Sequence, residues 1–147
     1  MSDSVHREDL ADGGVRLSTR RCSFTFHRVA PFALKIVIAG RDTGQFGTSV
    51  FNEIRFHLSG PKALELFVDA SEAAGPTTEV SDAWTRFLTK EAPHLKRVTI
   101  LTVSKFVHLT VSVAKLFSRT GDLIQIYSDP KLFAAALLRA TEDAGRA

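Results

Sequence analysis

Hydrophobic and polar positions alternate along this chain in short runs, and the period of the alternation changes from one run to the next. In residues 20–27, Cys22, Phe24 and Phe26 alternate with polar side chains, which predicts a strand with one buried face. Residues 34–39 are almost all apolar, as expected of a strand covered on both faces. Similar apolar runs at 63–70, 96–103 and 122–129 predict three more strands, so that about five strands are expected.

Helical patterns lie between these strands. Residues 48–58 have apolar positions three or four residues apart, begin with Thr48 or Ser49 as a cap, and are followed by Gly60 and Pro61. A second apolar face over 80–88 ends before Pro93, and a third helix is predicted after Asp129 and Pro130. Alternating strands and helices predict an α/β fold with parallel strands joined by crossovers.

Residues 105–119 fit two different periods. As a strand, Val107, Leu109, Val111 and Val113 alternate with polar side chains, and β-branched residues favour this state. As a helix, the polar side chains form one continuous stripe. This stretch lies between two predicted parallel strands, and a parallel connection needs a dozen or more residues, usually helical. We therefore predict a crossover helix here, the fourth helix of the chain.

Length and composition predict one folded domain. The chain has 147 residues, of which 44% are hydrophobic and 24% charged, as in ordinary globular proteins. Residues 1–14 are polar and end with two glycines, so we predict a disordered lead-in followed by a single domain over 15–147. No apolar signal sequence or membrane-spanning run is present, which leads us to expect a cytoplasmic protein. A net charge of +3 is too small to predict a nucleic-acid partner.

The residue patterns of common catalytic and metal sites are not found. The spacing of Gly40, Gly44 and Gly47 differs from that of dinucleotide-binding and phosphate-binding loops, so a turn is predicted. The five histidines have no metal-ligand spacing, and the single cysteine, Cys22, lies in an apolar strand pattern that predicts a core position. We therefore expect a protein that is not an enzyme and needs no metal or cofactor.

Several segments together resemble the STAS domains, a family named for sulphate transporters and anti-sigma factor antagonists. They are "LKIVIAGRDTGQFGTSVFNEI", "LELFVDAS", "HLKRVTILTVS", "VHLTVSVAKLF" and "LIQIYSDPKLFAAAL". The resemblance covers about residues 34–138. It implies a small mixed, mostly parallel sheet of about five strands with four helices mainly on one face. The implied function is a non-catalytic regulatory module that binds a partner protein in bacterial-type signalling.

The same resemblance leaves a second function open. A sister branch of STAS-like proteins is similar in its closing segment and is thought to bind lipids or other apolar ligands. The eleven phenylalanines of this chain could line a cleft for such a ligand, or they could simply fill the core. The alternative function is therefore an apolar-ligand, lipid or membrane-surface binding domain of the same fold.

Thr78 and Ser81 are the candidate sites of a phosphorylation switch. In the antagonist branch of the family, a Ser or Thr that opens the helix after an Asp-bearing strand is phosphorylated by a partner kinase. Thr78 and Ser81 follow Asp69 at about that position, although the Asp before and the Gly after the family's phosphorylated residue are missing. The alternative for Thr78 is a helix N-cap.

A basic stripe is predicted on the helix at 105–119. Lys105, His108, Lys115 and Arg119 share one side of it, and no acidic residue interrupts residues 98–120. The stripe predicts a docking surface for an acidic protein partner or for anionic lipid head groups. A solvated face without a partner is the alternative.

Overall fold

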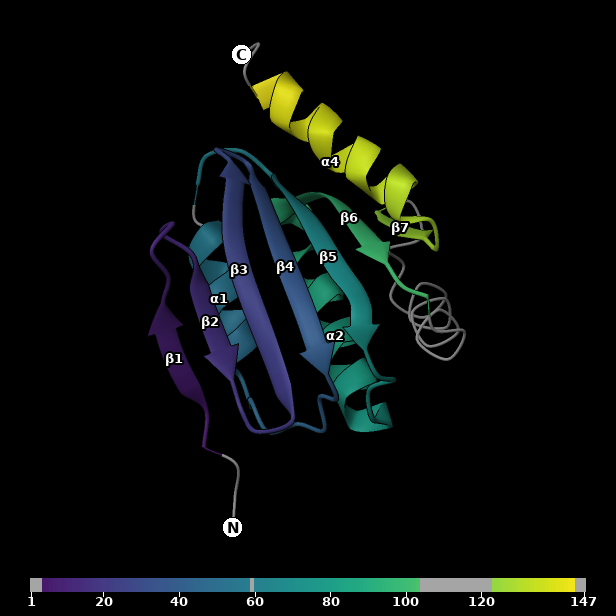
Figure 1. Ribbon diagram of the computed structural model, residues 1–147. Coiled ribbons are helices and arrows are strands. Elements are labelled where there is room, and N and C mark those ends of the chain that lie inside the picture. The colour runs from purple at the N-terminus through teal and green to yellow at the C-terminus, as the bar shows by residue number, and fades with distance from the viewer. Residues whose placement is uncertain (1–3, 59, 104–122, 145–147) are drawn as a thin grey trace.

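The structure is a computed structural model that describes residues 4–58, 60–103 and 123–144. One sheet of seven strands runs through these residues, and its strands lie side by side in chain order (Figure 1). The strands are β1 (His6–Asp9), β2 (Val15–Ser18), β3 (Cys22–Ala30), β4 (Ala33–Gly40), β5 (Leu64–Ala73), β6 (Leu95–Leu101) and β7 (Ile124–Tyr127).

The sheet is mixed in equal parts. β1 to β4 form an antiparallel meander, whereas β4 to β7 pair in parallel. The parallel half matches the predicted alternation of strands and crossovers, including the neighbouring positions of β6 and β7. The predictions of about five strands and of a mostly parallel sheet were wrong, because two short N-terminal strands extend the antiparallel half.

Those two strands carry little of the pattern that identifies a strand in sequence. Every residue of β1 is exposed, and β2 has four residues of which only Leu17 is buried. An edge strand is held mainly by backbone hydrogen bonds, which need no apolar side chains. The Arg7 guanidinium adds an ion pair of 2.8 Å with Glu53. Residues 6–9 are thus part of the sheet, and a disordered lead-in does not describe them.

The helices of the described residues lie on both faces of the sheet. α1 (Ser49–Leu58) and α2 (Thr78–Glu91) cover one face, and Figure 1 shows them behind the strands. α2 ends in a short 3₁₀ turn, η1 (Ala92–His94), that contains Pro93. α4 (Pro130–Ala144) packs through Phe133 on Phe67 of β5. The residues before and after Phe67, Leu66 and Val68, belong to the core beneath α1 and α2. Since successive strand residues point to opposite faces, α4 lies on the other face.

The predicted helices at 48–58, 80–88 and after Pro130 are confirmed as α1, α2 and α4. The fourth predicted helix, at 105–119, lies outside the described residues, so the expected arrangement of four helices mainly on one face is only partly matched. The main core fills the space between the sheet and the pair α1 and α2. Its most deeply buried large side chains include Phe24, Phe26, Leu34, Ile36, Ile54 and Leu66.

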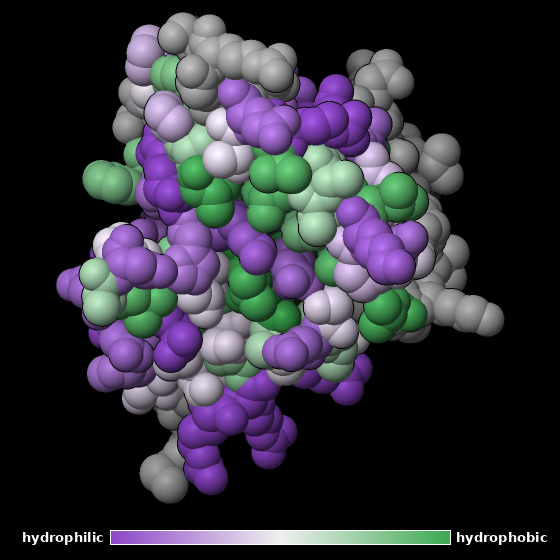
Figure 2. Space-filling model, turned by 45° about the horizontal axis from the view of Figure 1, so that its top comes forward, coloured by the Kyte–Doolittle hydropathy of each residue, from purple (hydrophilic) through white to green (hydrophobic). Residues whose placement is uncertain are grey.

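Among the described residues, α4 is the helix that covers the opposite face of the sheet. α4 crosses it near one end of the strands (Figure 1). With this end turned forward, Figure 2 shows hydrophobic surface in small patches between hydrophilic side chains. Leu132 and Leu138 of α4 are among the exposed apolar residues of the described chain. Scattered apolar residues of this kind are ordinary on a protein surface.

Candidate functional site beside helix α2

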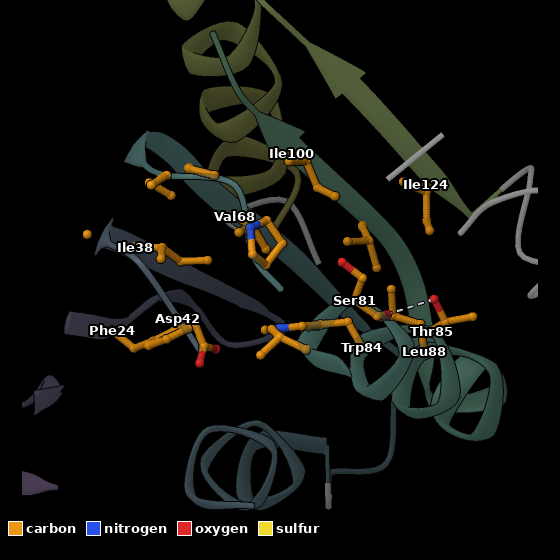
Figure 3. Close-up of a pocket in the computed structure, with 17 residues that line it drawn as sticks. Phe24, Ile38, Asp42, Val68, Ser81, Trp84, Thr85, Leu88, Ile100 and Ile124 are labelled. Atoms are coloured by element: carbon orange, nitrogen blue, oxygen red, sulfur yellow. Dashed lines mark hydrogen bonds between the residues drawn. The ribbon is translucent and has the colours of Figure 1, made fainter. Parts of the chain in front are cut away.

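An apolar pocket lies between helix α2 and the sheet, where the main core approaches the surface (Figure 3). Its volume is about 120 Å³. Strands β3 to β7 form one wall, α2 forms the facing wall, and the segments that follow β4 and β5 close one end. The lining residues are Phe24, Ile38, Gly40, Asp42, Val68, Ala70, Ala73, Ala74, Pro76, Val80, Ser81, Trp84, Thr85, Leu88, Val98, Ile100 and Ile124.

The pocket is apolar because of the strand pattern that makes the core. Ile38, Val68 and Ile100 project from three neighbouring strands toward α2, as the alternation of side chains along each strand requires (Figure 3). From the helix, Trp84 forms part of the facing wall. The Trp84 ring packs edge-on against Phe51 of α1, with 5.0 Å between ring centroids. This contact holds the only tryptophan of the chain against the pocket.

Two hydroxyl groups line the pocket, and they differ in their hydrogen bonds. Thr85 Oγ1 donates to the backbone carbonyl of Ser81 at 2.9 Å, one helical turn earlier. Ser81 Oγ is buried and has no hydrogen-bond partner among the described residues. Buried polar atoms are nearly always hydrogen-bonded in folded proteins. Among the described residues, Ser81 therefore presents an unsatisfied hydroxyl to a mostly apolar wall.

Asp42 is the one ionisable residue among the described residues that line the pocket. Its carboxylate accepts a hydrogen bond of 2.9 Å from the backbone N–H of Gly44. Burial raises the pKa of Asp42 above its ordinary value, and the Gly44 bond offsets this only in part. The pocket thus has one group that can carry negative charge, and burial favours the neutral form of that group.

The glycine-containing loop that carries Asp42 is a turn, as predicted. Gly40 has a φ of 87°, and a Cβ there would lie 2.0 Å from the Arg21 carbonyl oxygen, so only glycine fits. The Gly44 amide points at the protein's own Asp42 carboxylate. An amide used in this way is not free to bind a phosphate.

The candidate switch residues occupy different environments. The N-cap of α2 is Thr77, whose hydroxyl accepts from the Val80 N–H at 3.3 Å, so the expectation of Thr78 as the cap was wrong by one residue. Thr78 is the first residue of α2 and is exposed. Ser81 lies one turn further along, with its hydroxyl enclosed. The structure therefore separates two residues that the sequence placed together.

The predicted basic stripe of Lys105, His108, Lys115 and Arg119 lies outside the described residues. A docking surface there stays a prediction.

Three other features bear on function in the part of the chain that the structure describes: the cysteine, possible metal ligands and the helices. Cys22 is buried, and burial raises the pKa of its thiol to about 12, so it is not a reactive thiolate. Residues 4–58, 60–103 and 123–144 contain no cluster of three or more metal-ligating side chains. None of the helices in these ranges combines the length and apolar composition needed to span a membrane.

The sequence did not reveal the pocket. Trp84 and Val80 were assigned to the buried face of a helix, and Asp42 to a turn, and each assignment is correct by itself. What brings them together is the packing of α2 on the sheet. A Ser on the sheet-facing side of a helix, as Ser81 is relative to Val80, Trp84 and Leu88, is the one signal that could have indicated a polar point in this wall.

Comparisons with known proteins support the fold. No family model matches the chain, and no curated protein matches it. Among solved structures, the chain is similar to an uncharacterised protein of the DUF3478 family with a SpoIIAA-like fold from Shewanella loihica PV-4. The TM-score is 0.59 at 18% sequence identity, over 80% of this chain and 94% of that one. This likeness shows a SpoIIAA-like, and hence STAS-like, fold, and it shows the fold alone.

Proposed function

We propose that this chain is a non-catalytic binding module that takes an apolar ligand into the pocket beside α2. The observation that carries the proposal is the pocket itself, an apolar space of about 120 Å³ at the edge of the core. Ligand sites are typically concave and mostly apolar, with a few polar groups that fix orientation. This was the alternative that the STAS resemblance left open, and the pocket favours it.

The size of the pocket sets the kind of ligand. An engineered apolar cavity of about 150 Å³ in another protein stays dry and binds benzene. A pocket of 120 Å³ is therefore suited to a small ring or a short stretch of alkyl chain. A longer lipid would place only its end in the pocket.

The only tryptophan of the chain makes binding easy to measure, because Trp84 lines the pocket. Titration with toluene should give a saturable change in tryptophan fluorescence. The matched control is Ala70→Leu, which puts a larger apolar side chain into the pocket from β5 and should abolish the change. A flat wild-type titration, or equal responses from wild type and Ala70→Leu, would contradict the proposal.

Regulatory contact with a partner protein is a second candidate, and the exposed Thr78 at the start of α2 supports it. A phosphate on Thr78 would meet the positive end of the helix dipole and would be tolerated by the fold. A pull-down with wild type, Thr78→Ala and Thr78→Glu tests this idea. A partner lost only with Thr78→Glu supports a switch, and identical captured proteins for all three variants contradict it.

A further inference from the structure

The wall of the pocket contains one buried side-chain oxygen that has no hydrogen-bond partner among the described residues. Ser81 Oγ has no partner, whereas the other lining hydroxyl, on Thr85, donates to the Ser81 carbonyl (Figure 3). A hydroxyl enclosed without a partner costs stability relative to an apolar side chain of the same shape. A ligand whose own polar group forms a hydrogen bond with Ser81 Oγ would remove this loss of stability.

Charge along the pocket limits which polar group the ligand can carry. Among the described lining residues, Asp42 alone is ionisable, and no cationic side chain accompanies it. An anionic ligand would therefore find no counter-charge among these described residues and would lie next to a carboxyl group. The Asp42 carboxylate already accepts a hydrogen bond of 2.9 Å from the Gly44 N–H, and the rest of the described lining offers a cation no charged partner.

We propose that the ligand is an uncharged, largely apolar molecule with a single hydrogen-bonding group, such as an alcohol, and that this group binds Ser81 Oγ. The inference rests on the proposed binding function and names the class of ligand. Ser81 is then the residue that orients the ligand, while the apolar wall formed by Val68, Ile100 and Trp84 supplies most of the affinity.

Three probes of nearly equal shape separate the effects of the apolar wall, of the hydrogen bond to Ser81 and of ligand charge. Toluene is wholly apolar, benzyl alcohol adds a neutral hydroxyl, and benzoate adds a negative charge. Each is titrated into wild type and Ser81→Ala at near-neutral pH, with Trp84 fluorescence as the readout. Thr78→Ala is the control, because Thr78 is exposed on the same helix and does not line the pocket.

Ser81→Ala should weaken benzyl alcohol binding by about three- to ten-fold, the value of one net hydrogen bond. The same variant should bind toluene as well as wild type does, or more tightly, because an unsatisfied hydroxyl has been removed. Thr78→Ala should bind both probes as wild type does. Benzoate should bind wild type more weakly than benzyl alcohol.

The outcomes distinguish this inference from the function on which it rests. If wild type does not bind toluene, the proposed function fails and the inference fails with it. If toluene binds but Ser81→Ala weakens toluene and benzyl alcohol equally, the pocket binds apolar ligands without using Ser81, and the inference is overturned. Benzoate binding as tight as that of benzyl alcohol would overturn the choice of an uncharged ligand.

Discussion

Thr78 and Ser81 are neighbours on the surface of α2, yet their side chains have different environments. Thr78 begins α2 and faces solvent, whereas Ser81 faces the sheet with its hydroxyl enclosed. In the sequence both are small hydroxyl residues at the start of one predicted helix, so they were equivalent candidates. Their environments differ because α2 is anchored through Val80, Phe87 and Leu88, and this anchoring fixes which side of the first turn is covered.

The two sites should respond in opposite ways to a negative charge. Thr78→Glu should leave the free energy of unfolding within about 1 kcal/mol of wild type, because it adds an acidic side chain at an exposed helix N-terminus. Ser81→Glu should lower it by about 2 kcal/mol or more, because a carboxylate would be buried against apolar side chains. Urea unfolding measures both.

Ser81→Ala serves as the control for the loss of the serine itself and should be at least as stable as wild type. If Ser81→Glu proved as stable as Thr78→Glu, the Ser81 side chain would have to face solvent, contrary to the structure.

Asp42 should make stability depend on pH. Burial raises its folded-state pKa above the ordinary value of 3.8, so ionisation costs stability at any pH above that raised pKa. The cost shrinks as pH falls through the folded-state pKa and is gone below 3.8, where the carboxyl is protonated in both states. Asp42→Asn removes the ionisation while keeping an oxygen that can accept from Gly44.

Asp42→Asn should therefore melt at a higher temperature than wild type near neutral pH, and the two curves should converge as the pH falls toward 3.8. Thermal unfolding of both proteins across this pH range is the measurement. A constant difference between them at every pH would show that the effect is not due to ionisation.

At the scale of whole elements, the sequence predicted best where side chains face a core. α1, α2 and α4 and strands β3 to β7 all bury a face or a stripe, and their hydrophobic periods revealed them. β1 buries none of its residues and was missed. The division of the helices between two faces was also missed, because the period of α4 shows that it has a buried side but not which face of the sheet it meets.

Phe133 is the one buried side chain among the described residues of α4. Phe133 is 4% exposed and packs edge-on against Phe67, with 6.1 Å between ring centroids. Phe133→Ala should remove about 3 kcal/mol of packing, and most of this loss should appear as local opening of α4. Hydrogen exchange should therefore speed up in α4 amides while α2 amides keep their protection.

Leu138→Ala is the matched control, since Leu138 lies on the same helix and is 59% exposed. It should leave exchange in α4 nearly unchanged. Equal acceleration by both variants would mean that α4 is not anchored through Phe133.

For the whole molecule, the STAS resemblance anticipated the fold that the comparison with a SpoIIAA-like structure supports. It could not anticipate the pocket. Pocket residues come from five strands, one helix and two loops, and no short sequence pattern joins Phe24 to Ile124. Whether side chains of this kind meet closely or leave a space depends on how far α2 stands from the sheet, which is a property of the assembled molecule.

The central claim is that an apolar, ligand-sized space exists beside α2, and a crystal structure under xenon pressure tests it most directly. Xenon enters apolar cavities and needs no hydrogen bonds. We expect xenon density between Trp84 of α2 and the strand residues Val68 and Ile100, and we expect that density to be lost in Ala70→Leu. A wild-type crystal whose side chains fill this space, or in which xenon binds elsewhere and not here, would contradict the claim.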